Sequence, residues 1–137
     1  MQRRAVFRST LALLLAMHLS FAATPDNWAG EYADKKFLNG SATFQLTIEE
    51  SGNKIQVSFD AVNNGGRGCA PEAQAIVTVN GKDKLQFSFQ DSEGNAGKGT
   101  ITRAGDNDLI VSLKATKVAK QECAKFYRDN IHLKRVE

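Results

Sequence analysis

The chain has 137 residues, enough for a single domain, with a formal net charge of +3, two cysteines and two histidines. Arg3, Arg4 and Arg8 supply the excess charge, because the 15 other Lys and Arg residues balance 15 Asp and Glu residues. This balance excludes a nucleic-acid partner selected by net charge, and no low-complexity segment or linker interrupts the chain.

The first 22 residues have the layout of a secretory signal peptide. After the three arginines comes a short apolar run, Leu11–Leu19, and the small residues Ser20 and Ala22 stand where signal peptidase reads. The run is too short to span a bilayer. We therefore expect cleavage after Ala22, a periplasmic or secreted single domain of residues 23–137, and no membrane anchor.

Export and the loss of this segment change what the cysteines and histidines indicate. An even cysteine count in an oxidising compartment favours a disulfide, and Cys69 with Cys123 is the one possible pair. The bond would close a loop of roughly 54 residues and stabilise the fold by about 3–4 kcal/mol. His132 is the one remaining histidine, which argues against a His-rich metal site and against Ser-His or Cys-His catalysis.

Most of the remaining chain alternates between apolar and polar residues, with turn residues at regular intervals. The alternation predicts about eight strands, at residues 28–32, 42–49, 55–59, 75–79, 85–89, 99–103, 109–113 and 131–135. Residues 115–125 fit either a short helix or an irregular loop. Period-two alternation means one buried face, which predicts an all-β, antiparallel up-and-down barrel, with a two-sheet sandwich as the alternative.

The side chains expected inside the barrel are large. We predict a largely filled interior from the inward positions Phe44, Leu46, Ile48, Phe59, Phe87, Phe89 and Leu133. His132 lies between two of the apolar positions of its strand, so the same alternation turns it outward.

The loop 63–72 is the strongest candidate for a binding site. Gly65, Gly66 and Gly68 surround Arg67, two residues before Cys69. Glycine permits backbone conformations closed to other residues, and a disulfide would hold one end of the loop in place. A rigid loop that presents one guanidinium suits insertion into an acidic cleft, whereas the structural alternative is a tethered connection at the barrel rim.

Two other loops are expected to be ordinary turns. The segment 91–95 carries three oxygen-bearing side chains, but its spacing does not match a calcium loop, and we predict no metal and no cofactor. No pair of carboxylates is spaced for acid-base chemistry, so we expect no catalytic residues.

The run Trp28-Ala29-Gly30-Glu31-Tyr32 at the start of such a meander resembles calycin-type barrels, the group of lipocalins and avidins. The resemblance implies that Trp28 and Tyr32 plug one barrel end and that Arg135 or Lys134 packs over the tryptophan. Size, export and a single disulfide also resemble bacterial periplasmic lysozyme inhibitors. The chain lacks the Tyr-x-Cys-x-x-Gly run of their membrane-associated type, so no inhibitory residue is transferred from them.

Together these observations predict an exported, non-enzymatic binding protein. We expect an inhibitor or immunity-type protein that acts on a cell-wall hydrolase or an envelope toxin and uses the Arg67 loop. The alternative is a carrier of a small apolar ligand inside the barrel. An enzyme is the third hypothesis, since calycin-like barrels include a few.

Overall fold

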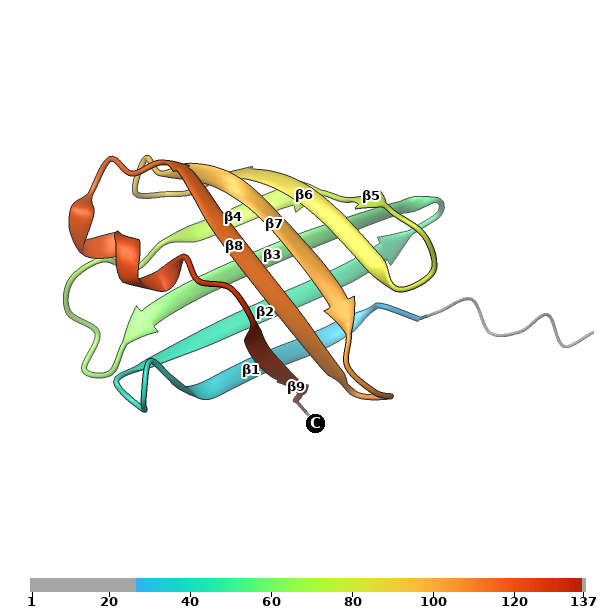
Figure 1. The fold of residues 1–137 in the computed structure, drawn as a ribbon, viewed down its shortest axis with the longest axis horizontal. Helices are drawn as coiled ribbons and strands as arrows, with labels where there is room; N and C mark the ends of the chain where they lie inside the picture. The colour runs from blue at the N-terminus through green and yellow to red at the C-terminus, as the bar shows by residue number, and fades with distance from the viewer. Residues whose placement is uncertain (1–26, 137) are drawn as a thin grey trace, which may run out of the picture.

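The computed structural model of the protein describes residues 27–136, so the expected signal peptide and its cleavage site lie outside the described residues. The described chain forms one antiparallel sheet that curls into a nearly closed barrel with a short 3-10 helix at one end (Figure 1). The all-β, disulfide-bonded barrel predicted from alternation is confirmed. No helix within residues 27–136 is long and apolar enough to cross a membrane.

Nine strands and one helix follow the chain as a meander. They are β1 (Gly30–Phe37), β2 (Ala42–Ser51), β3 (Lys54–Asn63), β4 (Glu72–Ile76), β5 (Thr78–Val79), β6 (Lys84–Gln90), β7 (Ala96–Arg103), β8 (Asp108–Lys117), η1 (Gln121–Phe126) and β9 (Ile131–Arg135). The count exceeds the predicted eight because Val77 divides the strand expected at residues 75–79. The first part of that strand pairs with β3 and the second with β6. The ambiguous segment 115–125 contains the end of β8 and most of η1.

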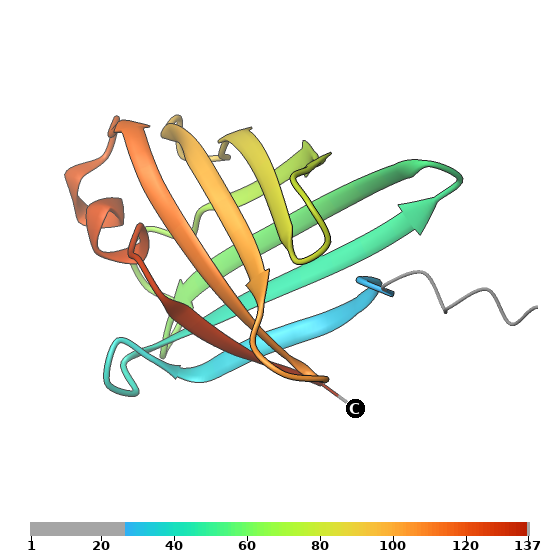
Figure 2. The ribbon, with the colours of Figure 1, turned by 45° about the vertical axis from the view of Figure 1, so that its right-hand side comes forward.

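The sheet order is β4-β3-β2-β1-β9-β8-β7-β6-β5, and the barrel is weakly joined at two places. At one of them, Ser92 donates its backbone N–H to the Glu72 carbonyl at 2.8 Å, and the Glu72 N–H bonds the Ser92 hydroxyl at 3.0 Å. At the other, β1 and β9 share only the pairs Tyr32–Arg135 and Ala33–Lys134. Both ribbon views show β9 crossing β1 at a steep angle (Figures 1 and 2).

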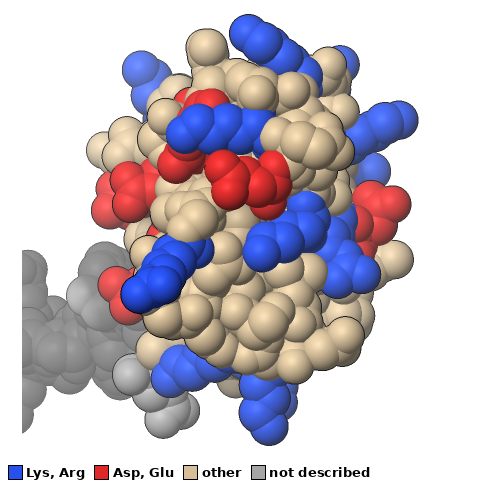
Figure 3. Space-filling view, turned by 90° about the vertical axis from the view of Figure 1, so that its left-hand side faces the viewer, with Lys and Arg blue, Asp and Glu red and all other residues tan. Residues whose placement is uncertain are grey.

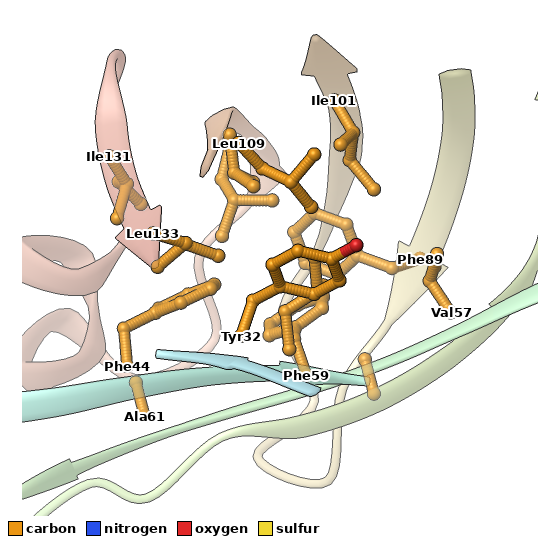
Figure 4. Packing of buried hydrophobic residues seen from close by; sticks show 14 of the residues in the cluster. Tyr32, Phe44, Val57, Phe59, Ala61, Phe89, Ile101, Leu109, Ile131 and Leu133 are labelled. Carbon is orange, nitrogen blue, oxygen red and sulfur yellow. The ribbon is translucent and has the colours of Figure 1, made fainter. Parts of the chain in front are cut away.

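Aromatic rings fill the interior between the two halves of the barrel. Phe59 lies at the centre, with its ring centroid 5.7 Å from Phe44 and 5.1 Å from Phe89. Figure 4 shows side chains from both halves pointing toward one another around these rings. Every position predicted to face inward is buried, which confirms the expectation of large inward side chains. These inward side chains pack against one another in one hydrophobic core.

Two glycines make room for the phenylalanines of β6. A Cβ atom built on Gly99 would lie 2.1 Å from Cζ of Phe87, and one built on Gly97 would lie 2.7 Å from Cζ of Phe89. Each ring therefore lies over the bare backbone of β7, where a larger residue would collide with it. Two successive inward positions of β7 are thus glycines rather than apolar side chains.

Candidate functional site

The predicted Arg67 loop lies at the barrel end that also carries η1 and the β1–β2 turn. Figure 3 shows this end, where basic and acidic side chains intermingle in the upper half and the centre of the lower half is uncharged, with basic side chains around its edge. Residues 64–68 are all exposed, whereas Cys69 is buried. The loop is thus presented to solvent from a fixed base.

Left-handed backbone conformations shape the loop. Gly65, Gly66 and Gly68 have φ angles of 88°, 72° and 86°, a region that side-chain-bearing residues rarely adopt. The Gly66 N–H bonds the carbonyl of Asn63 at 2.9 Å, and the Asn63 amide bonds the carbonyl of Arg67 at 2.8 Å. Asn63 therefore spans the loop from inside and holds the backbone of Arg67, which sequence reasoning did not foresee.

The disulfide and a lysine connect this loop to η1. Cys69 and Cys123 are bonded, as predicted, with their Cα atoms 5.3 Å apart. The Lys125 ammonium donates to Oδ1 of Asn63 at 2.7 Å. η1 itself rests on the core, because Phe126 is buried and its ring stacks 6.3 Å from that of Phe37. The loop is thus attached to η1 at its first residue, Asn63, and at Cys69, and the core holds η1 in turn.

A second connection, between the β6–β7 turn and the chain leading into η1, was not predicted from the sequence. Asp91 and Asn95 were expected to form an ordinary turn, yet they are the two buried polar residues of residues 27–136. Asp91 accepts hydrogen bonds from the Tyr127 hydroxyl and the Asn95 amide, while Oδ1 of Asn95 accepts from the backbone of Ala119 at 2.7 Å and Lys120 at 3.1 Å. Burial and the Asp91 carboxylate raise the pKa of Tyr127. The network satisfies buried polar groups and fixes the chain that leads into η1.

An exposed ion pair links the same two segments on the surface. The Lys120 ammonium bonds the Glu93 carboxylate, which lowers the pKa of Glu93 and raises that of Lys120. Solvent screens such a pair, so its contribution to stability is small. Among residues 27–136 this is the one salt bridge, and the Arg67 guanidinium has no carboxylate partner.

The opposite barrel end holds the predicted plug, with a different basic residue over the tryptophan. Trp28 and Tyr32 are both buried. The Arg103 guanidinium lies 3.9 Å from the centre of the Trp28 ring, whereas Arg135 lies over Tyr32 at 5.0 Å and bonds its hydroxyl at 2.8 Å. The expectation that Arg135 or Lys134 covers Trp28 is therefore wrong. Arg103 is the last inward position of β7, which brings it to this end.

These contacts make the Trp28 end a closed structural plug. Arg135 also donates to the carbonyl of Ala29 at 3.0 Å, and the Tyr32 hydroxyl donates to the carbonyl of Trp28 at 3.0 Å. These groups are directed at one another, although Nε and Nη2 of Arg103 and Nε of Arg135 are buried without a hydrogen-bond partner in residues 27–136. At the other barrel end, residues 64–68 are exposed, Arg67 among them.

No group of three His, Cys, Asp or Glu side chains is placed to hold a metal within the described part of the chain. His132 is exposed on β9, as the alternation predicted. No protein-family model matches this sequence, and no curated protein matches it significantly.

Proposed function

We propose that this protein is an exported, non-enzymatic binding protein that inhibits a cell-wall hydrolase or an envelope toxin through its Arg67 loop. The observation that carries the proposal is the way in which that loop is anchored to the rest of the protein. Its backbone is held by Asn63, its base is joined to η1 by the disulfide, and its arginine points to solvent without a carboxylate partner in residues 27–136.

A rigidly anchored loop suits a protein that blocks a cleft. A loop held in its bound shape loses little conformational entropy on association, so more of the contact energy is kept as affinity. A guanidinium binds carboxylates through two parallel hydrogen bonds, and hydrolases that cleave glycosidic bonds carry a pair of carboxylates at the reaction centre. The Arg67 guanidinium would bind these carboxylates and block the cleft, and it offers no glycosidic bond for them to cleave.

The filled interior supports this proposal over the carrier hypothesis. The buried phenylalanines pack on one another at centroid distances of 5.1–6.3 Å, and Phe59 of β3 contacts both Phe87 and Phe89 of β6. A small apolar ligand would have to displace those rings. Native mass spectrometry of freshly purified protein checks this point, and we expect the mass of the protein alone.

Two experiments test the proposal, inhibition of muramidases and capture of a partner protein. Purified residues 23–137 are assayed against muramidases of several structural types, and the immobilised protein is used to capture hydrolases from envelope extracts. We expect inhibition of one type, with a complex of defined stoichiometry. The proposal fails if no muramidase is inhibited and no cell-wall hydrolase or toxin is captured.

A further inference from the structure

A groove follows the place where β1 and β9 separate. It consists of two adjoining hollows of about 640 and 300 Å³ that share Asp34, Lys36 and His132. We call it the β1/β9 groove. The side chains that line it from β1, β9 and the segments beside them include Lys35, Lys36, Arg128, His132, Lys134 and Arg135.

Positive charge is concentrated in this groove. Four Lys and Arg residues (Lys35, Lys36, Arg128 and Lys134) line it against two carboxylates, Asp34 and Asp129, whereas the guanidinium of Arg135 is directed into the Trp28 plug. The Asp34 carboxylate already accepts the backbone N–H of Lys36 at 3.0 Å. Because the chain after residue 22 carries equal numbers of basic and acidic residues, this excess is local and favours an anionic ligand.

The backbone of β9 also faces the groove. The Val136 N–H bonds the Glu31 carbonyl at 2.8 Å, and the Arg135 N–H bonds Asn107 on the opposite side at 3.0 Å. Backbone groups of a strand alternate between its two edges, so those of His132 lie on the β1 side. The pairing with β1 ends at Lys134, and no strand of residues 27–136 pairs with β9 at His132 on that side. A peptide can add to such an edge.

We propose that the β1/β9 groove binds an extended acidic segment of a partner protein. The segment would add to the open edge of β9 through the N–H and C=O of His132. Its carboxylates would pair with Lys35 and Lys134, which are both exposed beside that edge. Strand addition provides backbone hydrogen bonds, and the flanking side chains select the sequence. Arg67 does not line this groove, so the groove proposal does not depend on the hydrolase proposal.

Charge-reversal variants test the side-chain part of the proposal. A short oligoglutamate peptide is titrated into the wild-type protein and into the double variant Lys35→Glu with Lys134→Glu. We expect the variant to bind at least roughly tenfold more weakly. The matched control reverses Lys98 and Lys114, an exposed cross-strand pair on β7 and β8, and should bind within about twofold of wild type. Equal losses in both variants would overturn the proposal, provided that both melt at the wild-type temperature.

An N-methylated peptide tests the strand-addition part. Methylation of alternate amides removes the donors on one edge of the peptide without changing its charge, and we expect it to abolish binding. In amide NMR spectra, the His132 resonance should shift with the unmodified peptide. Equal binding of the methylated peptide, or equally tight binding of inorganic polyphosphate, would identify a plain anion site and contradict the proposal. The Arg67→Ala variant should bind the peptide like wild type, which separates this surface from the proposed inhibitory loop.

Discussion

Single residues decide how tightly the barrel is packed, and Gly99 is the sharpest case. Its missing side chain is the space into which the Phe87 ring fits, because three ring atoms lie within 2.6 Å of the position that a Cβ atom would take on that glycine. The ring has little room to retreat, since Phe59 and Phe89 lie against it with centroids 6.3 Å away. A methyl group at Gly99 therefore strains the core.

We expect Gly99→Ala to lower the free energy of unfolding by about 1–3 kcal/mol, as overpacking does in closely packed cores. Urea denaturation of the purified protein measures the change. A second substitution, Phe87→Leu, removes the colliding ring atoms and should cost less in the Gly99→Ala background than in the wild type. Purely additive effects would show that the two residues do not compete for this space.

The loop glycines act through conformation rather than packing. A Cβ atom on Gly66 would meet nothing within 4 Å, yet its φ of 72° disfavours any side chain. Under the proposed function, Gly66→Ala should weaken inhibition several-fold and lower the free energy of unfolding by about 1–2 kcal/mol, the cost of a side chain in the left-handed region. An inhibition assay with a melting curve separates the two effects. Unchanged inhibition would mean that the loop's shape does not matter for binding.

At the scale of elements, a buried hydrogen-bond network attaches η1 to the β6–β7 turn. Tyr127→Phe deletes the hydroxyl that bonds Asp91 and should cost about 1–3 kcal/mol, since a buried carboxylate loses a donor. Tyr127 in the folded state holds its proton more tightly than in the unfolded chain, where its pKa is 10.0. Wild-type stability should therefore fall as pH rises above about 10, and the variant should lose part of that dependence. Parallel alkaline stability curves would contradict this.

Two like charges face each other across neighbouring strands. Asp60 on β3 pairs in register with Glu72 on β4, and burial together with Glu72 raises the pKa of Asp60 above its ordinary value of 3.8. The folded state thus binds this proton more tightly, so stability declines as pH rises from about 3.8 through the raised pKa. Asp60→Asn should gain roughly a few tenths of a kcal/mol at pH 7 and nothing near pH 3. An equal gain at both pH values would exclude the electrostatic cause.

The sequence predicts an element well when the element's own residues determine its structure, and poorly when distant residues do. Alternation located the strands, because each strand's own residues determine which face is buried. The break at Val77 was not visible, since alternation continues while the pairing partner changes from β3 to β6. The role of Asn95 was hidden for a similar reason: its partners, Ala119 and Lys120, lie 24 and 25 residues away.

At the scale of the whole molecule, the disulfide joins two segments separated by 54 residues at the end that carries the proposed binding loop. Replacing both Cys69 and Cys123 with alanine should lower the free energy of unfolding by about 3–4 kcal/mol, because the unfolded chain regains the entropy of the open loop. Chemical denaturation measures the loss. A loss below about 1 kcal/mol would show that the Asp91 network and the core hold η1 without the bond.

If the first 22 residues are cleaved as expected, the remaining chain carries equal numbers of basic and acidic residues and one histidine, His132. What the sequence could not predict was the distribution of that balanced charge. The basic β1/β9 groove depends on β9 crossing β1, so that Lys35 and Lys134, which are 99 positions apart, border one opening. Only the closure of the barrel brings them together.

The proposed function requires Arg67, held in place by the disulfide-bonded loop, to insert into an acidic cleft of the hydrolase. The most direct measurement compares inhibition of the susceptible hydrolase by wild-type protein, Arg67→Ala, Arg67→Lys and the control Lys82→Ala at the opposite barrel end. We predict a loss of roughly 30-fold or more for Arg67→Ala, a partial loss for Arg67→Lys because its ammonium cannot pair in two places, and none for the control. Wild-type inhibition by a folded Arg67→Ala variant would contradict the account.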